Sequence, residues 1–325
     1  MTLMQGIIIG LSTLLLTIIA GYLYIPLLRR LKFGQSIREE GPQSHQKKAG
    51  TPTMGGLIFF TSIIVASILF SILYGWWTTE LSVLLIVFIG YGLIGFVDDF
   101  IIVVMKNNQG LTSIQKLIAQ IVVGVVAYFL LRTSVHFSTE ITLPFSTFTI
   151  DLGVFYLLFL IFWLVGFSNA VNLTDGLDGL VGGTTTFTFM AFAWIAYQVN
   201  EPTVLFLSII VIAGMIGFLY FNHKPAKVFM GDTGSLALGG LIAAISILLK
   251  IEILLLLIGL IYVIETLSVI IQVISFKLTG KRVFKMSPIH HHFELSGWSE
   301  WRVVLTFWSV SLVSAILAIV LGGFL

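Results

Sequence analysis

Acidic side chains gather in three short segments of this sequence, and their types suit the binding of a divalent cation and of phosphate. GFVDDF carries the adjacent carboxylates Asp98 and Asp99, NAVNLTDGLDGL carries Asp175 and Asp178, and VFMGDTGS carries Asp232. Adjacent carboxylates repel each other unless a cation or a shared proton lies between them. Magnesium is commonly bound by one or two carboxylates together with substrate phosphates. The residue types therefore predict a magnesium-dependent site for a phosphorylated substrate.

Each acidic segment also has an alternative explanation. The aspartate pair can be a solvated helix end, and NAVNLTDGLDGL can be an Asx-rich turn that caps the next helix. The latter segment also resembles a calcium loop, but the EF-hand pattern with its terminal glutamate is absent. VFMGDTGS lacks the GxxxxGK[ST] spacing of a P-loop, although Gly231 and Gly234 allow backbone amides to approach an anion. Together the three segments favour a nucleotide and metal site.

Two basic segments accompany the acidic ones. SPIHHHFE places His290, His291 and His292 in succession. Zinc is one possible ligand, but consecutive residues of a helix cannot all turn towards one metal, so we predict that at least one histidine contacts phosphate. HQKKAGTPTMGG places Lys47 and Lys48 before a turn of glycine, threonine and proline. This segment can be a simple charged anchor, yet its interrupted backbone also suits the lining of a site.

The composition shows which elements must position these segments. Hydrophobic residues make up 58% of the 325 residues and charged residues only 10%, whereas soluble chains contain about 25% charged residues. The absence of cysteine excludes disulfides, thiolate metal sites and a cysteine nucleophile. The net charge of +2 gives no indication of nucleic-acid binding. We predict an all-α polytopic integral membrane protein with a single membrane-embedded domain over residues 1–325.

The apolar runs predict about ten transmembrane helices, because a helix needs about 20 apolar residues to cross the hydrocarbon core. The predicted spans are residues 3–28, 55–74, 81–97, 114–131, 152–170, 177–199, 203–221, 235–249, 253–276 and 303–325.

Basic residues predict which side each loop faces, because cytoplasmic loops carry an excess of Lys and Arg. With ten spans, all of the 17 Lys and Arg residues except Arg132 and Lys250 fall on one side, together with every motif described above. We therefore predict that both termini lie outside and that the active-site loops lie on the cytoplasmic face. Residues 132–151 alternate β-branched and aromatic side chains around Pro144, which predicts a small hairpin on the outer surface.

The five segments resemble, in sequence and in order, those of the polyprenyl-phosphate N-acetylhexosamine-1-phosphate transferase superfamily. KKAGTPTMGG, GFVDDF, NAVNLTDGLDGL, VFMGDTGS and SPIHHHFE extend over nearly the whole chain. The TPTMGG and HHHFE forms resemble the phospho-N-acetylmuramoyl-pentapeptide transferases within it. The resemblance implies transfer of phospho-N-acetylmuramoyl-pentapeptide from a UDP carrier to undecaprenyl phosphate, with release of UMP and formation of the first lipid-linked peptidoglycan precursor.

The resemblance also implies roles for individual residues. Asp98, Asp99 and Asp232 are the expected catalytic acids, and Asp232 is the expected ligand of Mg²⁺. Contacts with the nucleotide, sugar or phosphate are expected at Lys48, Thr53, Asn169, Asn172, Asp175, Asp178, Asn222, Phe229, Gln272, His290, His291 and His292.

The expected partners are UDP-N-acetylmuramoyl-pentapeptide, undecaprenyl phosphate and the lipid bilayer of a bacterial inner membrane, with no nucleic acid. The sequence leaves the oligomeric state open, a homodimer included. A related transferase that uses UDP-N-acetylglucosamine is one alternative. A secondary transporter is another, but transporter sites lie near the bilayer midplane, and here only Glu265 is predicted to lie deep in a span. A membrane scaffold would not explain the acidic loops.

Overall fold

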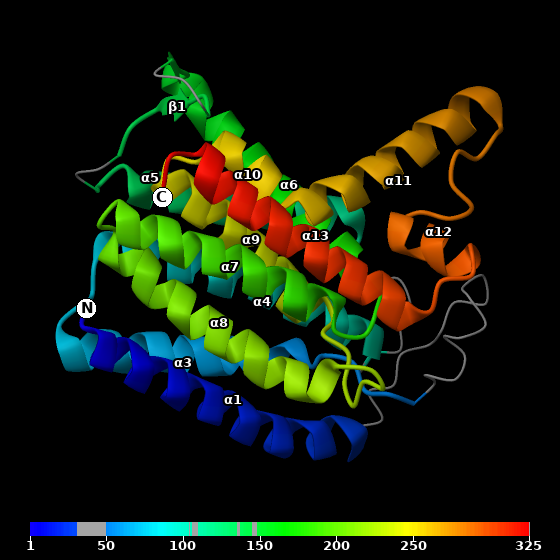
Figure 1. The fold of residues 1–325 in the computed structure, drawn as a ribbon, viewed down its shortest axis with the longest axis horizontal. Helices are drawn as coiled ribbons and strands as arrows, with labels where there is room; N and C mark the ends of the chain where they lie inside the picture. Colours follow the sequence, from blue (N-terminus) through cyan, green and yellow to red (C-terminus); the bar gives the residue numbers. More distant parts are fainter. Residues whose placement is uncertain (31–49, 104, 106–109, 135–136, 145–147, 325) are drawn as a thin grey trace.

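The computed structural model describes residues 1–30, 50–103, 105, 110–134, 137–144 and 148–324, and within them the chain is mainly helical (Figure 1). The elements are α1 (Leu3–Arg30), α3 (Gly56–Tyr74), α4 (Thr79–Val103), α5 (Ser113–Leu131), β1 (Glu140–Thr142), β2 (Thr149–Asp151), the 3₁₀ helix η1 (Gly153–Phe155), α6 (Tyr156–Thr174), α7 (Leu180–Gln198), α8 (Pro202–Asn222), α9 (Asp232–Leu248), α10 (Glu252–Ile258), α11 (Leu260–Thr279), α12 (Ile289–Leu295) and α13 (Glu300–Leu321).

Nine helices among the described residues are long and apolar enough to cross a membrane. This finding confirms the prediction of an all-α polytopic membrane protein. The eighth predicted span, residues 235–249, corresponds to α9, which has only 17 residues. At 1.5 Å per residue, α9 is about 26 Å long, slightly less than the hydrocarbon thickness of about 30 Å. It begins at Asp232, so this acid lies in its first turn.

The ninth predicted span, residues 253–276, is wrong as one continuous helix, because the chain breaks at Gly259 into α10 and α11. Glycine has low helix propensity, and a Cβ at Gly259 would lie 3.2 Å from the carbonyl oxygen of Leu255 and from the ring of Phe167. In Figure 1, α11 diverges from the bundle. Hydropathy could not reveal this break, since the residues on both sides of Gly259 are apolar.

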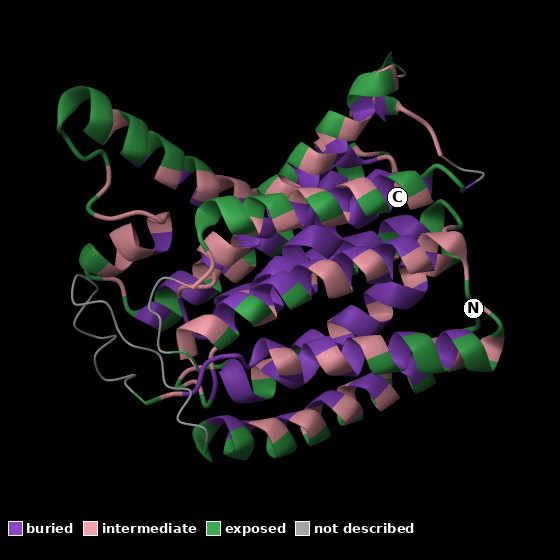
Figure 2. Ribbon diagram, turned by 180° about the vertical axis from the view of Figure 1, so that it is seen from behind, coloured by how far each residue is buried: buried purple, intermediate pink, exposed green. Residues whose placement is uncertain are grey.

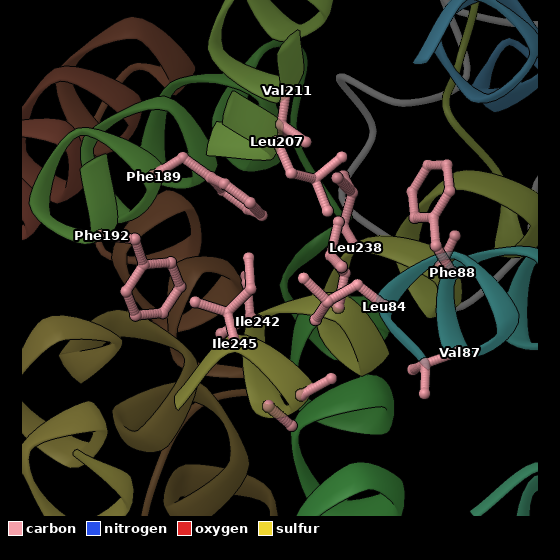
Figure 3. Close-up of a cluster of buried hydrophobic side chains, with 14 of the residues drawn as sticks. Leu84, Val87, Phe88, Phe189, Phe192, Leu207, Val211, Leu238, Ile242 and Ile245 are labelled. Atoms are coloured by element: carbon pink, nitrogen blue, oxygen red, sulfur yellow. The ribbon is translucent and has the colours of Figure 1, made fainter. Parts of the chain in front are cut away.

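Helix α9 forms the centre of the bundle. Its residues 233–247 are all buried, and it packs mainly against α4 and α6. Small residues permit this close approach: a Cβ at Gly239 would lie 2.4 Å from the carbonyl oxygen of Phe167, and one at Gly240 would lie 3.0 Å from the ring of Tyr91. Figure 3 shows side chains of α4, α7 and α8 meeting those of α9. Figure 2 shows this buried centre enclosed by exposed outer helices, including α1 and α11.

The two ends of the bundle differ. Both termini and the strands β1 and β2 lie at one end in Figure 1, whereas α12 lies at the other. The strands pair antiparallel, with Glu140 opposite Asp151, so the predicted hairpin within residues 132–151 is confirmed. Asp98, Asp175 and Asp232 all lie at or near helix ends, where the loops meet at the end opposite the hairpin. The bundle therefore gathers residues that are far apart in the sequence at one of its ends.

Candidate active site

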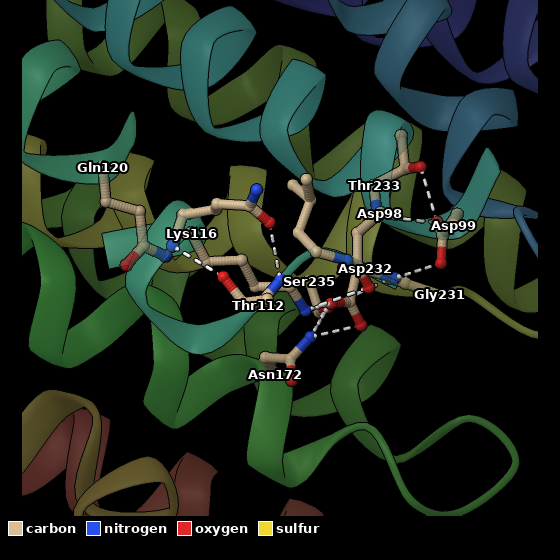
Figure 4. Close-up of polar contacts among 12 residues, drawn as sticks. Asp98, Asp99, Thr112, Lys116, Gln120, Asn172, Gly231, Asp232, Thr233 and Ser235 are labelled. Atoms are coloured by element: carbon tan, nitrogen blue, oxygen red, sulfur yellow. Dashed lines mark hydrogen bonds and ion pairs between the residues drawn. The ribbon is translucent and has the colours of Figure 1, made fainter. Parts of the chain in front are cut away.

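Asp99 ties the first turn of α9 to α4. Its Oδ1 accepts a hydrogen bond from the backbone N–H of Asp232 at 3.1 Å. Its Oδ2 accepts bonds from the backbone N–H and the hydroxyl of Thr233, at 2.9 and 2.7 Å. The free N–H groups and the dipole at a helix N-terminus favour an anion there. Asp99, which is 5% exposed, therefore caps α9 and fixes the position of Asp232 (Figure 4).

Lys116, in the first turn of α5, joins the carboxylates of Asp98 and Asp232. Its Nζ lies 2.9 Å from Oδ2 of Asp98 and 2.7 Å from Oδ2 of Asp232 (Figure 4). Oδ1 of Asp98 accepts the backbone N–H of Leu111 at 2.7 Å. Oδ1 of Asp232 accepts a bond from Nδ2 of Asn172, also at 2.7 Å. One oxygen of each acid thus accepts a hydrogen bond from an uncharged N–H group, and the other faces the ammonium group of Lys116.

Two asparagines of α6 lie beside this group. Nδ2 of Asn172 also donates to the hydroxyl of Ser235 at 3.0 Å, which places it inside the cluster. Asn169 lies about one helical turn earlier, and its Nδ2 donates to Oε1 of Gln120 at 3.2 Å and to the carbonyl oxygen of Val165 at 2.8 Å. The structure therefore brings Asn172 into direct contact with Asp232 and places Asn169 at the margin.

The segment that precedes α3 forms another wall. Residues 52–56 pair with residues 229–230 through backbone hydrogen bonds of 2.7–2.8 Å, which places Thr53 and Phe229 near the start of α9. Gly231 has a φ of +76°, and a Cβ there would lie 2.8 Å from Oδ2 of Asp99 and 3.1 Å from Oγ1 of Thr53. Glycine is needed at this position for both reasons. Lys48 lies outside the described residues.

Asp178 and Asn222 hold the loops together. Oδ2 of Asp178 accepts the backbone N–H of Ala226 at 3.1 Å. Asn222 accepts the N–H of Gly179 at 3.0 Å and donates to the carbonyl oxygen of Val228 at 2.9 Å. Both side chains are 4% exposed. Their predicted contact with substrate stays a prediction, and the contacts described here join the α6–α7 loop to the α8–α9 loop.

Glu300, at the start of α13, adds an ionic contact to this junction. Its Oε1 accepts the backbone N–H of Asp178 at 3.0 Å, and its Oε2 lies 2.9 Å from Nζ of Lys224. Leu177 and Leu180 pack with Val303, Val304 and Phe307 in a separate buried cluster that also includes Ile261. Helix α13 therefore supports the loop that carries Asp175.

Asp175 follows α6 directly and is only partly exposed. Burial raises the pKa of its carboxyl to about 7, and the negative charge of Asp232 acts in the same direction. The backbone N–H of Gly231 donates to this carboxyl and opposes the increase in pKa. A carboxyl with this pKa can gain or lose a proton near neutral pH when a cation or phosphate approaches.

The three histidines have different surroundings. His290 is fully buried, its Nδ1 lies 2.9 Å from Oε1 of Glu265, and its Nε2 has no hydrogen-bond partner. A Cβ at Gly176 would lie 2.2 Å from that Nε2, so His290 packs directly beneath the α6–α7 loop. Nδ1 of His291 lies 3.0 Å from Oε2 of Glu294. Nδ1 of His292 accepts the backbone N–H of Lys285 at 3.1 Å.

The side chain of Gln272, on α11, forms hydrogen bonds with the backbone of the loop before α12. Its Oε1 accepts the N–H groups of Val283 and Phe284 at 3.0 and 2.9 Å, and its Nε2 donates to the carbonyl oxygen of Phe284 at 2.9 Å. It is 9% exposed. Its predicted substrate contact is not tested by these bonds, which give it a structural function at the edge of the site.

No group of three or more His, Cys, Asp or Glu residues in the described chain is arranged to hold a metal ion.

Comparisons with known proteins show which family this chain belongs to. The family model described as glycosyl transferase family 4 matches residues 81–250, and that described as phospho-N-acetylmuramoyl-pentapeptide-transferase signature 1 matches residues 48–60. A protein of Halalkalibacterium halodurans named phospho-N-acetylmuramoyl-pentapeptide-transferase is 62% identical over 306 residues, which cover 94% of each chain. The chain belongs to the phospho-N-acetylmuramoyl-pentapeptide-transferase family. Relatives of the same name from a Geobacillus species and from Staphylococcus epidermidis are 60% and 56% identical, over 94% of both chains and over 97% and 98% of the two chains, respectively.

Membership of the phospho-N-acetylmuramoyl-pentapeptide-transferase family confirms the resemblance that the motifs predicted. The structure brings the predicted residues Asp98, Asp99, Asn172 and Asp232 into one bonded group. Sequence reasoning missed Lys116 as a site residue and assigned it only to the positive charge of the cytoplasmic face. It also missed Glu300. The contacts of Lys116 with Asp232 and of Glu300 with Asp178 each join residues more than a hundred positions apart, so no local spacing in the sequence reveals them.

Proposed function

We propose that this chain transfers phospho-N-acetylmuramoyl-pentapeptide from its UDP-linked donor to undecaprenyl phosphate, giving UMP and the first lipid-linked peptidoglycan precursor. Relatives that carry the transferase name support the reaction. The observation that carries the proposal is the contact of one ammonium group, that of Lys116, with carboxylate oxygens of both Asp98 and Asp232. A site that gathers carboxylates around a cation is suited to a metal and to substrates that carry phosphate.

The arrangement fits a magnesium ion. Asp232 and Asp98 each direct one oxygen to the same cation, and Lys116 supplies that positive charge in the structure. Magnesium needs only one or two carboxylates when phosphates and water supply the remaining ligands. Asp232 is the proposed ligand, with Asp98 beside it. A bound magnesium ion would neutralise charge on the transferred phosphoryl group.

The chain's own residues then have separate tasks. Asp232 lies at the N-terminus of α9. Its backbone N–H donates to Asp99, and its carboxylate accepts a hydrogen bond from Asn172. Asp99 is a positioning residue in this scheme, because its bonds go to the backbone and to Thr233. Asp98 orients the acceptor phosphate or takes its residual proton. A phosphate monoester has its second pKa near 6 and is largely a dianion at neutral pH, so the acceptor needs little activation by a base.

The proposed location is the bacterial inner membrane, with the site facing the cytoplasm and both termini outside. The distribution of basic residues supports this orientation. The chain has no cysteine, so single cysteines can be labelled without background. We expect Lys281→Cys, beyond the C-terminus of α11, to react with an impermeant thiol reagent only after the cells are opened. Val154→Cys, 83% exposed beside the hairpin, is expected to react in intact cells. The reverse pattern would overturn the orientation.

Release of UMP is the test of the activity. We expect the purified chain in lipid to release UMP from UDP-N-acetylmuramoyl-pentapeptide only when undecaprenyl phosphate and magnesium are both present. UDP-N-acetylglucosamine, offered in parallel, is expected to give no release. Release of UMP from the N-acetylglucosamine donor would show that the chain is a related transferase that uses UDP-N-acetylglucosamine. A lack of release from either donor, together with movement of a solute across the membrane, would indicate a transporter.

A further inference from the structure

We propose that Lys116 is a resident cation that occupies the metal-binding oxygens while the site lacks metal and moves to a substrate phosphate when the metal binds. The inference rests on the proposed function, since it assumes a magnesium site at Asp98 and Asp232. It adds a residue that the motifs do not include. It predicts two opposite effects: loss of this lysine should increase the affinity for the metal and lower the rate of the reaction.

The distribution of hydrogen bonds over the two carboxylates carries the first step. Oδ1 of Asp98 is held by the N–H of Leu111, and Oδ1 of Asp232 by the side chain of Asn172, both at 2.7 Å. Oδ2 of each acid accepts neither of these bonds and faces the side chain of Lys116. Lys116 Nζ contacts both of these oxygens, at 2.9 and 2.7 Å. The lysine therefore occupies the oxygens that a metal would use.

A metal bound to both of those oxygens would lie within a few ångströms of the ammonium group. Magnesium holds its oxygen ligands at about 2.0–2.1 Å and tolerates little departure from octahedral geometry. Two positive groups separated by a few ångströms also repel each other strongly where water is partly excluded. Asp98 has a side chain only 3% exposed, so the repulsion would be weakly screened. Binding of the metal must displace Lys116 from at least one of the two carboxylates.

The structure gives Lys116 room to move without disturbing the helix that carries it. Its side chain is 25% exposed, and a lysine has a flexible four-carbon stem. The backbone of α5 is fixed at its start by a capping box, in which Thr112 accepts from the N–H of Gln115 and Gln115 accepts from the N–H of Thr112. The ammonium group can therefore leave the carboxylates while α5 stays in place, and the phosphates that enter with the metal are its natural new partners.

Metal binding in the absence of nucleotide and lipid tests the inference. Titration calorimetry with magnesium chloride is carried out on the full chain, on Lys116→Met and Lys116→Gln, and on Lys281→Met, which removes the same charge from an exposed lysine. We expect both Lys116 variants to bind magnesium at least about tenfold more tightly than the unchanged chain, because a competing positive charge is gone. Lys281→Met is expected to bind as the unchanged chain does.

The same variants are then assayed for turnover. We expect Lys116→Met to lower kcat by at least about a hundredfold despite its tighter metal binding, because a charge that stabilises the transferred phosphoryl group is lost. Unchanged or weaker metal binding in both Lys116 variants, with unchanged thermal unfolding, would overturn the inference. Tighter binding with undiminished kcat would overturn the move to phosphate.

Asp232→Asn separates this inference from the proposed function. If Asp232→Asn and the unchanged chain bind magnesium equally well, the metal site itself is wrong and the proposed chemistry fails with it. If Asp232→Asn loses magnesium and the Lys116 variants bind as the unchanged chain does, only the role of Lys116 fails.

Discussion

Asp232→Asn is expected to lower turnover by at least about two orders of magnitude while leaving the protein folded, because it removes the proposed metal ligand. The backbone contacts that hold this residue do not depend on its carboxylate: the N–H of Asp232 donates to Asp99 whichever side chain residue 232 carries. An asparagine can still accept the bond from Asn172. The substitution therefore removes negative charge from the site with little change in shape.

The measurement is UMP release over a range of magnesium concentrations. Asp151→Asn is the matched control, because Asp151 lies in the hairpin at the other end of the bundle and its Oδ1 accepts bonds from Thr139 and Gly153 that an asparagine can also accept. The control is expected to retain normal turnover. Near-normal turnover of Asp232→Asn at saturating magnesium would refute the assignment of Asp232 as the metal ligand.

The same change at the other two acids is expected to have an effect of similar size for different reasons. Asp98→Asn removes a charge that faces the cation. Asp99→Asn leaves one acceptor oxygen where the structure uses two, so one of the bonds to Asp232 and Thr233 must weaken. Only the second variant is expected to lose thermal stability as well, since it uncaps a buried helix.

The membrane spans could be predicted from the sequence because the length of an apolar run is a local property. Each of the ten predicted segments overlaps a helix. Helix α9, with 17 residues, is slightly shorter than the other membrane-spanning helices. The break between α10 and α11 could not be predicted in this way, since Gly259 lies within an apolar run. A glycine in such a run is also compatible with a continuous span.

The candidate site was predictable only in part. Acidic residues are costly near hydrocarbon, so Asp98, Asp99 and Asp232 stand out in an apolar chain. Their partners do not: Lys116 resembles any other positive residue at a membrane boundary. Likewise, the burial of His290 against Glu265 depends on how α11 and α12 pack. Residue type therefore indicated which acids belong to the candidate site, whereas the contacts that join them to Lys116 and to α9 required the fold.

Gly95→Ala is expected to abolish most activity without touching any charged group. Gly95 lies on α4 one turn before Asp98 and Asp99, where α4 meets the start of α9. A Cβ at this position would lie 2.2 Å from the carbonyl oxygen of Asp232 and 2.6 Å from the backbone nitrogen of Thr233. Backbone atoms cannot rotate away as a flexible side chain can, so α4 and α9 must separate.

That separation would act directly on the site, because Asp99 bonds to α9 across the same contact. We expect a loss of turnover of at least about a hundredfold, since small misplacements of reacting groups have effects of this size. Overpacking should also lower stability by about 1–3 kcal/mol. Gly166→Ala is the matched control: Gly166 lies within α6, and a Cβ there would meet nothing within 4 Å. Equal activity of the two alanine variants would show that the α4–α9 contact does not determine the geometry of the acids.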